Sequence, residues 1–250
     1  MESIIKNRIF TLLKGIETGD PSSVEAINPE KYIQHNPQTY EGREGLAKLF
    51  KRLSLTSPRV NIVRIFEDGD YVFAHTEYDF SQSNIGFEVF RFEDDMTVEH
   101  WDNIQLRHEP NDSNHTMVSG PTEVKDLEKT EENRQIASSY VNDILIDRNF
   151  SKISSYINDD QFTQHNPFMS DGKSSIIDVL NNEGKLRYEK KHRVLAEGNF
   201  VLTVCEGYYS NKHSAIYDLY RIDSGILVEH WDTIESIPPR SEWKNENGKF

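Results

Sequence analysis

The chain has 250 residues, of which 36% are hydrophobic and 11% aromatic, and its formal net charge at pH 7 is −14. This length suits one large domain or two ordinary ones. A surface this negative repels phosphate groups, so we expect neither nucleic acids nor anionic membranes as partners. The single cysteine, Cys205, excludes an internal disulfide, and no apolar run is long enough for a signal peptide or a membrane span. We therefore expect a cytoplasmic protein.

The first part of the chain predicts helices. Apolar residues from Ile4 to Ile16 recur at helical spacing, and Gly19 follows where a glycine often ends a helix. Asp20-Pro21 is a typical start for a short second helix. A third helix is predicted to begin at Gly42.

After these helices the apolar period changes to two, which is typical of strands. Turn residues separate four stretches that are rich in β-branched and aromatic residues, and they predict a four-stranded antiparallel meander. These stretches are Val60–Phe66, Tyr71–Phe80, Ile85–Phe92 and Thr97–Gln105. Helices followed by a meander predict an α+β domain with a curved sheet around about three helices.

Two motifs recur along the chain. Gln34-His35-Asn36-Pro37 is repeated as Gln164-His165-Asn166-Pro167, and Val98-Glu99-His100-Trp101-Asp102 is repeated as Val228-Glu229-His230-Trp231-Asp232. Both repeats lie 130 positions apart (165 − 35 and 230 − 100). A constant, domain-sized separation indicates an internal duplication, so any function is present twice or divided between the halves.

The duplication predicts the limits of the domains. We expect a first copy over residues 1–107 and a second copy over residues 131–237. The stretch between them, residues 108–130, is polar and contains Pro110, Gly120 and Pro121, as linkers often do. Residues 238–250 are predicted to form a polar tail that drapes over a surface or frays.

The repeated motifs resemble those of the SnoaL-like group in the nuclear transport factor 2-like superfamily. The resemblance is carried by Tyr32–Pro37, by the helix that begins with Gly42, and by the strand pair Phe90–Phe92 and Val98–Gln105. It covers both halves and implies a cone-shaped sheet wrapped around about three helices, with a pocket at the open end. It also implies sheets that pair back to back, which two halves could supply as an intrachain pseudo-dimer. An exposed sheet edge leaves a further homodimer open.

Candidate chemistry gathers on the strand Val98–Gln105, whose side chains alternate between the two faces of the sheet. His100 and Asp102 share one face, so both can reach one ligand. Asp102 is the candidate general base, with His35 as its polar partner or as the acid. The second copy repeats this set as Asp232, His230 and His165. The alternative is that these side chains satisfy backbone groups at the sheet edge or on a neighbouring helix.

Other candidate ligand contacts are aromatic or histidine side chains of the same strands, namely Trp101, Trp231, Tyr78, Tyr208 and His75. Alternation places both tryptophans opposite the His/Asp pairs, so they line a pocket only if a bulge intervenes and otherwise pack between sheets. His75 corresponds to Cys205 in the second copy. An essential role for His75 would therefore leave only the first copy active, and the alternative is drift at an unimportant position.

The sequence contains no metal-site spacing and no nucleotide-binding or phosphate-cradling motif, so we expect neither a metal nor a cofactor. The family resemblance favours a small hydrophobic ligand, cyclic or carbonyl-bearing. The chemistry of an enzyme would then be cofactor-free cyclisation, isomerisation or hydration. The alternative is a non-catalytic ligand sensor or protein-interaction module. A cavity of roughly 300 Å³ or more that Asp102 or Asp232 reaches would favour the enzyme, and pockets filled by Phe and Tyr would favour the module.

Overall fold

The computed structural model describes residues 3–159 and 162–250. Met1, the predicted start of the first copy, lies outside the described residues. The chain divides into two compact units, one made of Met1–Leu106 with Ile237–Phe250 and the other of Arg107–Ser236. The stretch predicted as a linker therefore belongs to the second unit, and the predicted tail belongs to the first.

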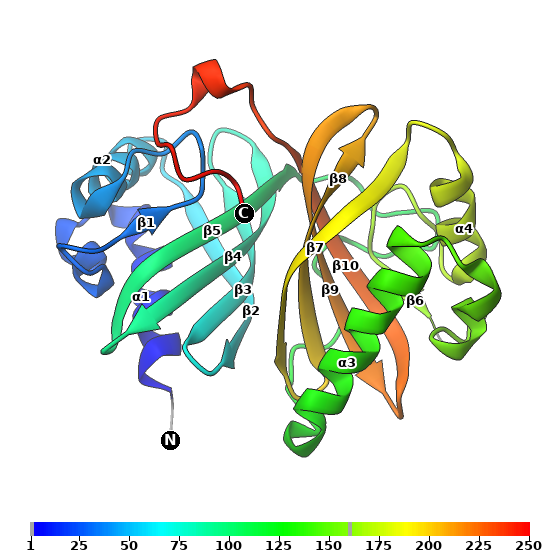
Figure 1. Ribbon diagram of the computed structural model, residues 1–250. Coiled ribbons are helices and arrows are strands. Elements are labelled where there is room, and N and C mark those ends of the chain that lie inside the picture. Colours follow the sequence, from blue (N-terminus) through cyan, green and yellow to red (C-terminus); the bar gives the residue numbers. More distant parts are fainter. Residues whose placement is uncertain (1–2, 160–161) are drawn as a thin grey trace. The chain divides into compact units, whose positions relative to one another are not determined.

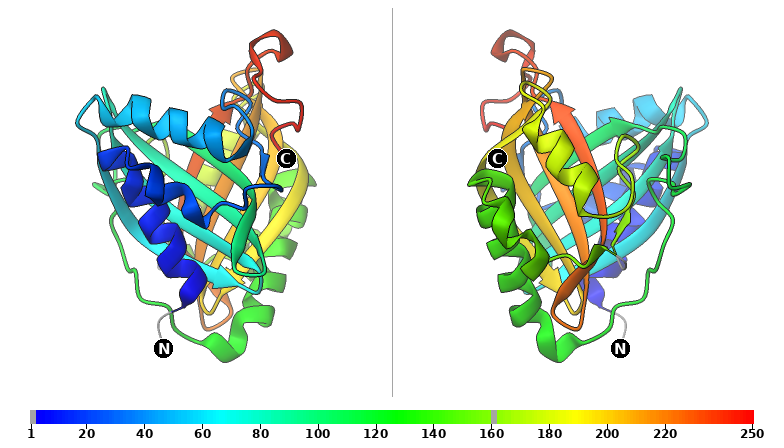
Figure 2. Two further views of the ribbon diagram at one scale, coloured as in Figure 1. Left: turned by 90° about the vertical axis from the view of Figure 1, so that its left-hand side faces the viewer. Right: turned by 90° about the vertical axis from the view of Figure 1, so that its right-hand side faces the viewer.

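The helices of the first unit follow the sequence pattern. Helix α1 (Ile4–Thr18) buries Ile9 and Leu12 on one face, and it ends at Gly19, whose φ of 66° is left-handed. The short helix η1 (Pro21–Ala26) begins after Asp20, whose carboxylate accepts a hydrogen bond from the Ser22 backbone NH. Helix α2 (Gly42–Ser54) completes the set. Figure 2 (left) shows α1 and α2 lying across one face of the sheet.

The first sheet contains the predicted meander and one additional strand. Its strands are β1 (Ile33–Gln34), β2 (Arg59–Asp68), β3 (Tyr71–Asp79), β4 (Ser83–Glu93) and β5 (Met96–Leu106), in the order β1-β5-β4-β3-β2. Strands β2 to β5 pair antiparallel, whereas β1 runs parallel to β5. β1 has only two residues, too few to show a strand period in the sequence. It brings the His-Asn-Pro motif beside Glu99 and His100, in the first half of β5 (Figure 1).

The second unit repeats this order. Its helical elements are η2 (Leu127–Lys129), α3 (Thr130–Tyr140), η3 (Val141–Ile146), η4 (Phe150–Ser155) and α4 (Lys173–Asn181). Its strands are β6 (Thr163–Gln164), β7 (Leu186–Glu197), β8 (Phe200–Tyr209), β9 (Lys212–Asp223) and β10 (Ile226–Ser236), in the order β6-β10-β9-β8-β7. Figure 2 (right) shows α3 and α4 over one face of this sheet. The predicted duplication of an α+β fold is confirmed by these two matching topologies.

A bulge sets the register between β4 and β5. Phe92 pairs with Thr97, but the next residue, Arg91, pairs with Glu99, so Val98 is an extra residue in β5. Glu88 consequently lies directly opposite Asp102. The second sheet has the same bulge at Val228 between β9 and β10 and places Asp218 opposite Asp232. Each unit therefore has two carboxylates facing each other across neighbouring strands.

Each unit has its own apolar core between its helices and the inner face of its sheet. In the first unit this core includes Ile9, Leu12, Leu46, Phe50 and Phe90. The second core is built in the same way and includes Tyr140, Leu145, Ile176, Leu180 and Tyr220. No helix among the described residues is long and apolar enough to cross a membrane.

Truncation of Ile9 is expected to destabilise the first unit. Ile9 is fully buried, so Ile9→Ala should lower the free energy of unfolding by about 2–5 kcal/mol through lost burial and a residual cavity. Ile4 on the same helix is 63% exposed, so Ile4→Ala is the control and should change it by less than about 0.5 kcal/mol. Urea unfolding of both variants measures the difference. Equal effects would contradict the burial pattern of α1.

Candidate functional site

The first unit encloses a cavity of about 200 Å³ between α1, α2 and the inner face of the sheet. Its walls are mainly aliphatic and aromatic side chains, including Leu12, Leu13, Ile16, Leu46, Phe50 and Phe90. Polar groups of β3, β4 and β5 form one side, and they are Tyr78, Glu88, His100 and Asp102. The exposed side chains Gln38 and Arg52 also line the cavity. The site is thus an apolar pocket with one buried polar wall.

His100 is held on this polar wall by hydrogen bonds at both ring nitrogens. Its Nε2 donates to Glu88 Oε2 at 2.7 Å, and its Nδ1 accepts from the Gln34 side-chain amide at 3.1 Å. The Phe90 ring stacks on His100 with centroids 4.2 Å apart. His100 is therefore a fixed group whose ring nitrogens are both engaged.

Glu88 is buried and receives two donors. Tyr78 donates its hydroxyl to Oε1 at 2.6 Å, and His100 donates to Oε2. Burial raises the pKa of Glu88 above its ordinary value, although the hydrogen bond and charge of His100 oppose the shift. Burial and the negative charge of Glu88 also raise the pKa of Tyr78 well above its usual range. Tyr78 is therefore a hydrogen-bond donor at neutral pH.

Asp102 is oriented by two donors from different parts of the unit. Asn36 donates its side-chain NH to Oδ2 at 2.7 Å, and the Lys249 ammonium lies 3.3 Å from Oδ1. Burial raises the pKa of Asp102, but the positive charges of Lys249 and His100 and the Asn36 hydrogen bond outweigh burial, so the pKa lies below its ordinary value. Asp102 is therefore an anion at neutral pH on the cavity wall.

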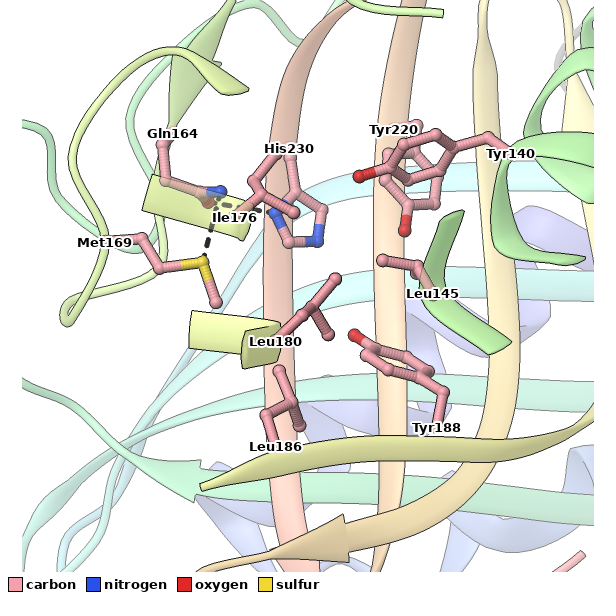
Figure 3. Close-up of a pocket in the computed structure, with 10 residues that line it drawn as sticks. All are labelled: Tyr140, Leu145, Gln164, Met169, Ile176, Leu180, Leu186, Tyr188, Tyr220 and His230. Carbon is pink, nitrogen blue, oxygen red and sulfur yellow. Dashed lines mark hydrogen bonds between the residues drawn. The ribbon is translucent and has the colours of Figure 1, made fainter. Parts of the chain in front are cut away.

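The corresponding pocket of the second unit is almost filled. It has a volume of about 20 Å³, and Tyr140, Tyr188 and Tyr220 line it together with His230 (Figure 3). The Tyr188 hydroxyl donates to Asp218 Oδ1 at 2.9 Å. In the first unit the Tyr78 hydroxyl donates to Glu88 in the same way. So small a space holds about one water molecule and no organic ligand.

His230 faces hydrogen-bond acceptors at both ring nitrogens. Gln164 Oε1 lies 2.9 Å from its Nδ1, and Asp218 Oδ1 lies 3.0 Å from its Nε2. A histidine that donates at both nitrogens is the imidazolium cation. Burial lowers the pKa of His230, but the hydrogen bond to Asp218 and the charges of Asp232 and Asp218 raise it. The pKa of His230 therefore lies above the ordinary value of a histidine.

Asp232 differs electrostatically from Asp102 despite its equivalent place. Asn166 donates to its Oδ2 at 2.6 Å, as Asn36 does for Asp102. Its Oδ1 has no hydrogen-bond partner among the described residues. Burial raises the pKa of Asp232 to about 6; the charge of His230 opposes this shift, and the charge of Asp218 adds to it.

The other face of each sheet carries a second histidine cluster. His35 stacks on Trp101 with centroids 4.6 Å apart and bonds to Glu99 Oε1 at 2.9 Å. Arg91 donates to the other oxygen of Glu99 at 2.7 Å. The second unit repeats this cluster with His165, Trp231, Glu229 and Arg221. Both tryptophans therefore lie on the face of the sheet that points away from the His/Asp pairs. The bulge at Val98 or Val228 does not change this arrangement, because it comes before these residues in the strand.

The structure therefore separates the predicted site residues into two groups. Asp102, His100 and Tyr78 line the cavity. His35 lies outside it, and the group that orients Asp102 is its neighbour Asn36, because successive side chains of an extended segment point to opposite faces.

His75 and Tyr208 also lie outside the cavities. His75 is fully buried, stacks on Phe87 and bonds to Arg64 at 3.0 Å. Tyr208 is half-buried under the Arg187 guanidinium.

Three groups of the site were not predicted from the sequence. Glu88 depends on the register set by the bulge at Val98; with no bulge, Trp101 would lie opposite Glu88. Asn36 belongs to the repeated motif, and its recurrence as Asn166 in the second copy could have indicated that it has a role in the site. Lys249 lies in a segment without any repeat or period, so nothing in the sequence connected it with Asp102.

Two equivalent clusters could offer ligands to a metal ion. In each cluster one ligand atom per residue lies within 4.8 Å of the others, and the sets are Glu88, His100, Asp102 and Asp218, His230, Asp232. In the first cluster both nitrogens of His100 are engaged and a lysine ammonium already lies beside Asp102. In the second cluster His230 carries a proton at each nitrogen, which leaves no lone pair for a metal.

Comparison with known proteins agrees with this architecture. Residues 10–100 match the family model of the SnoaL-like domain. The first unit is a SnoaL-like domain. The second unit repeats the strand order of this domain and its histidine motifs. No curated protein sequence matches the chain.

Several solved structures are similar to part of the chain. TsrD from Streptomyces laurentii is 20% identical, with a TM-score of 0.38, and the match covers 42% of this chain and 90% of TsrD. An LEH-like epoxide hydrolase of M. tuberculosis is 20% identical, with a TM-score of 0.35 and coverage of 43% and 85%. An NTF2-like protein from Cytophaga hutchinsonii is 11% identical, with a TM-score of 0.36 and coverage of 42% and 95%.

The two aspartates are expected to affect stability with opposite dependence on pH. The folded pKa of Asp232 is raised to about 6, so its stabilising contribution is complete below the unfolded pKa and is lost as pH rises through 6. As the pH rises from about 4 to about 8, the free energy of unfolding of Asp232→Asn should therefore increase relative to that of the wild type, by on the order of 2–3 kcal/mol. Amide hydrogen exchange in β10 reports this locally.

Asp102→Asn is the matched control. The folded pKa of Asp102 is lowered, so its contribution is present above the unfolded pKa and is lost as pH falls through the folded value. Asp102→Asn should therefore be most destabilising near neutral pH, with the effect read in β5. The same pH trend in both variants would refute the difference between the two units.

Proposed function

We propose that the first unit binds a small hydrophobic molecule, cyclic or carbonyl-bearing, and that Asp102 acts on it as a general base without a cofactor. The observation that carries the proposal is the cavity of about 200 Å³, which has apolar walls and an anionic, doubly oriented aspartate on one side. A cavity of about 150 Å³ is enough to hold benzene. The volume is below the roughly 300 Å³ that was expected of an enzyme pocket, so the cavity fits one or two rings and not a drug-sized molecule.

The hydrogen bonds support Asp102 as the base. Both nitrogens of His100 and both oxygens of Glu88 have partners inside the protein, so these groups position one another. Asp102 receives one donor at each oxygen, and a carboxylate has further lone pairs for a ligand. Asp102 is thus the group of this cluster best able to accept a proton from a bound molecule.

The electrostatics restrict the class of reaction. Because its pKa lies below the ordinary value, Asp102 is a weak base. A weak base removes a proton efficiently only from an acidic position, such as a carbon next to one or two carbonyl groups or an acidic hydroxyl. Isomerisation and cyclisation through an enolate meet this requirement. Hydration by an activated water is the less favoured alternative.

The second unit favours a non-catalytic role. Its pocket of about 20 Å³ is filled by tyrosine side chains, which is the arrangement expected of a scaffold. We propose that it supports the chain structurally while the first unit binds the ligand. The non-catalytic module that the sequence left open thus applies to one half of the chain.

The test begins with the small molecule that accompanies the purified protein. Mass spectrometry of the extracted protein identifies it, and turnover is then measured for two variants. Asp102→Asn should lower kcat by about 10²–10⁴-fold, the usual contribution of a general base. Asp232→Asn is the matched control and should leave kcat unchanged. If Asp102→Asn keeps full activity, the general-base assignment is wrong.

Obstruction of the cavity should prevent binding. Leu49 is half-buried and lines the cavity, so Leu49→Trp should weaken binding of 2-naphthol, a two-ring fluorescent probe, by about tenfold or more, or 1.4 kcal/mol. Leu55, at the end of the same helix, is 82% exposed, and Leu55→Trp should bind like wild type. Fluorescence titration gives both affinities. Similar affinity in the two variants would place the probe outside this cavity.

A further inference from the structure

The segment Ile237–Phe250 is part of the first unit and is bound along the His-Asn-Pro motif. Asn245 is buried, and its side-chain amide donates to the backbone oxygens of Asn36 at 2.7 Å and Thr39 at 3.0 Å. Asn247 donates to the Gln34 backbone oxygen at 3.0 Å. In Figure 1 the red segment accordingly runs beside β1. These side-chain bonds to backbone groups hold the segment in one position.

The contact between His35 and Gly248 brings the next residue to the site. His35 Nδ1 donates to the Gly248 backbone oxygen at 3.0 Å. Lys249 follows, and only 2% of its side chain is exposed. Its ammonium lies 3.3 Å from Asp102 Oδ1. A buried ammonium is strongly unfavourable unless it is paired, so its position indicates a specific interaction with the negative site.

We propose that Lys249 is a positioning residue of the first unit's site, which holds Asp102 as an oriented anion, so that residues 244–250 complete the site. This inference rests on the proposed role of Asp102. The charged and titratable groups around Asp102 come from every neighbouring element: Tyr32, Tyr78, Glu88, His100 and Lys249, with Arg52 on the same cavity. Among the described residues, Lys249 is the cationic side chain that bonds to an Asp102 oxygen.

The second unit serves as an internal comparison. There the Thr116 backbone oxygen lies 2.7 Å from His165 Nδ1. It takes the place that the Gly248 backbone oxygen has beside His35 Nδ1 in the first unit. The next residue is Met117, which is buried but carries no charge. Asp232 has one oxygen without a partner among the described residues, and its pKa is raised to about 6. An aspartate in the equivalent place thus has the opposite shift where no lysine is among the groups that shift its pKa.

The experiment is a carbon-13 NMR titration of the Asp102 carboxyl group in the full chain, assigned through the loss of its signal in Asp102→Asn. Lys249→Met should raise the Asp102 midpoint by about 1–3 pH units, because an adjacent positive charge lowers a carboxyl pKa by that amount. Lys249→Arg should restore most of the wild-type value. Lys244→Met removes an exposed charge from the same segment and should leave the midpoint unchanged.

A second variant keeps the test decisive if Lys249→Met folds poorly. The double substitution Asn245→Ala with Asn247→Ala removes the bonds that hold the segment and should raise the same midpoint. If neither variant moves the midpoint, Lys249 does not set the state of Asp102 and the inference is overturned. If turnover is measured, the acidic limb of its pH profile should move upward with Lys249→Met.

These outcomes separate the inference from the proposed function. A raised midpoint in Lys249→Met supports the positioning role even when the protein binds no ligand, a result that contradicts the proposed function alone. An unchanged midpoint overturns the positioning role even when Asp102→Asn abolishes turnover.

Discussion

Each unit buries two carboxylates that face each other across neighbouring strands, and the arrangement of its site depends on how this pair is stabilised. Glu88 lies opposite Asp102, and Asp218 lies opposite Asp232, on strands that are hydrogen-bonded neighbours. Like charges directly opposite each other in a sheet are destabilising, and burial makes both anions costlier. The surrounding side chains therefore supply donors or positive charge to the pair, and their identity decides what each site can do.

The two halves satisfy this constraint differently. In the first unit His100 bonds to Glu88, and Lys249 places an ammonium group beside Asp102. In the second unit His230 itself is the cation, and Tyr188 reaches Asp218 from β7. The first arrangement leaves an ionised aspartate beside an open cavity. The second has an aspartate of raised pKa, and the pocket of that unit is filled by tyrosine side chains. Duplication has thus kept one framework with two electrostatic states.

The segments between and after the repeated strands complete the sites. Arg107–Thr130 follows β5 but belongs to the second unit, where Asn111 donates to the Gln164 backbone oxygen and Trp231 donates to that of Ser119. Ile237–Phe250 follows β10 but belongs to the first unit. In each unit the His-Asn-Pro motif is therefore stabilised by a segment that follows the last strand of the other unit. Polar, aperiodic sequence carries side-chain amides that bind exposed backbone groups.

The sequence alone determined the duplication, the order of the helices and of the four meander strands, and the alternation that separates His100 and Asp102 from Trp101. These features are local or periodic, so residue spacing is sufficient to show them. Only the tertiary structure showed that Asn36 rather than His35 orients Asp102, that Glu88 faces Asp102, and that Lys249 reaches the cavity. The first depends on the parallel pairing of a two-residue strand and the second on a one-residue bulge. The third depends on the position of a segment about 150 residues away along the chain. Contacts of this kind follow from how distant segments pack, which no local pattern records.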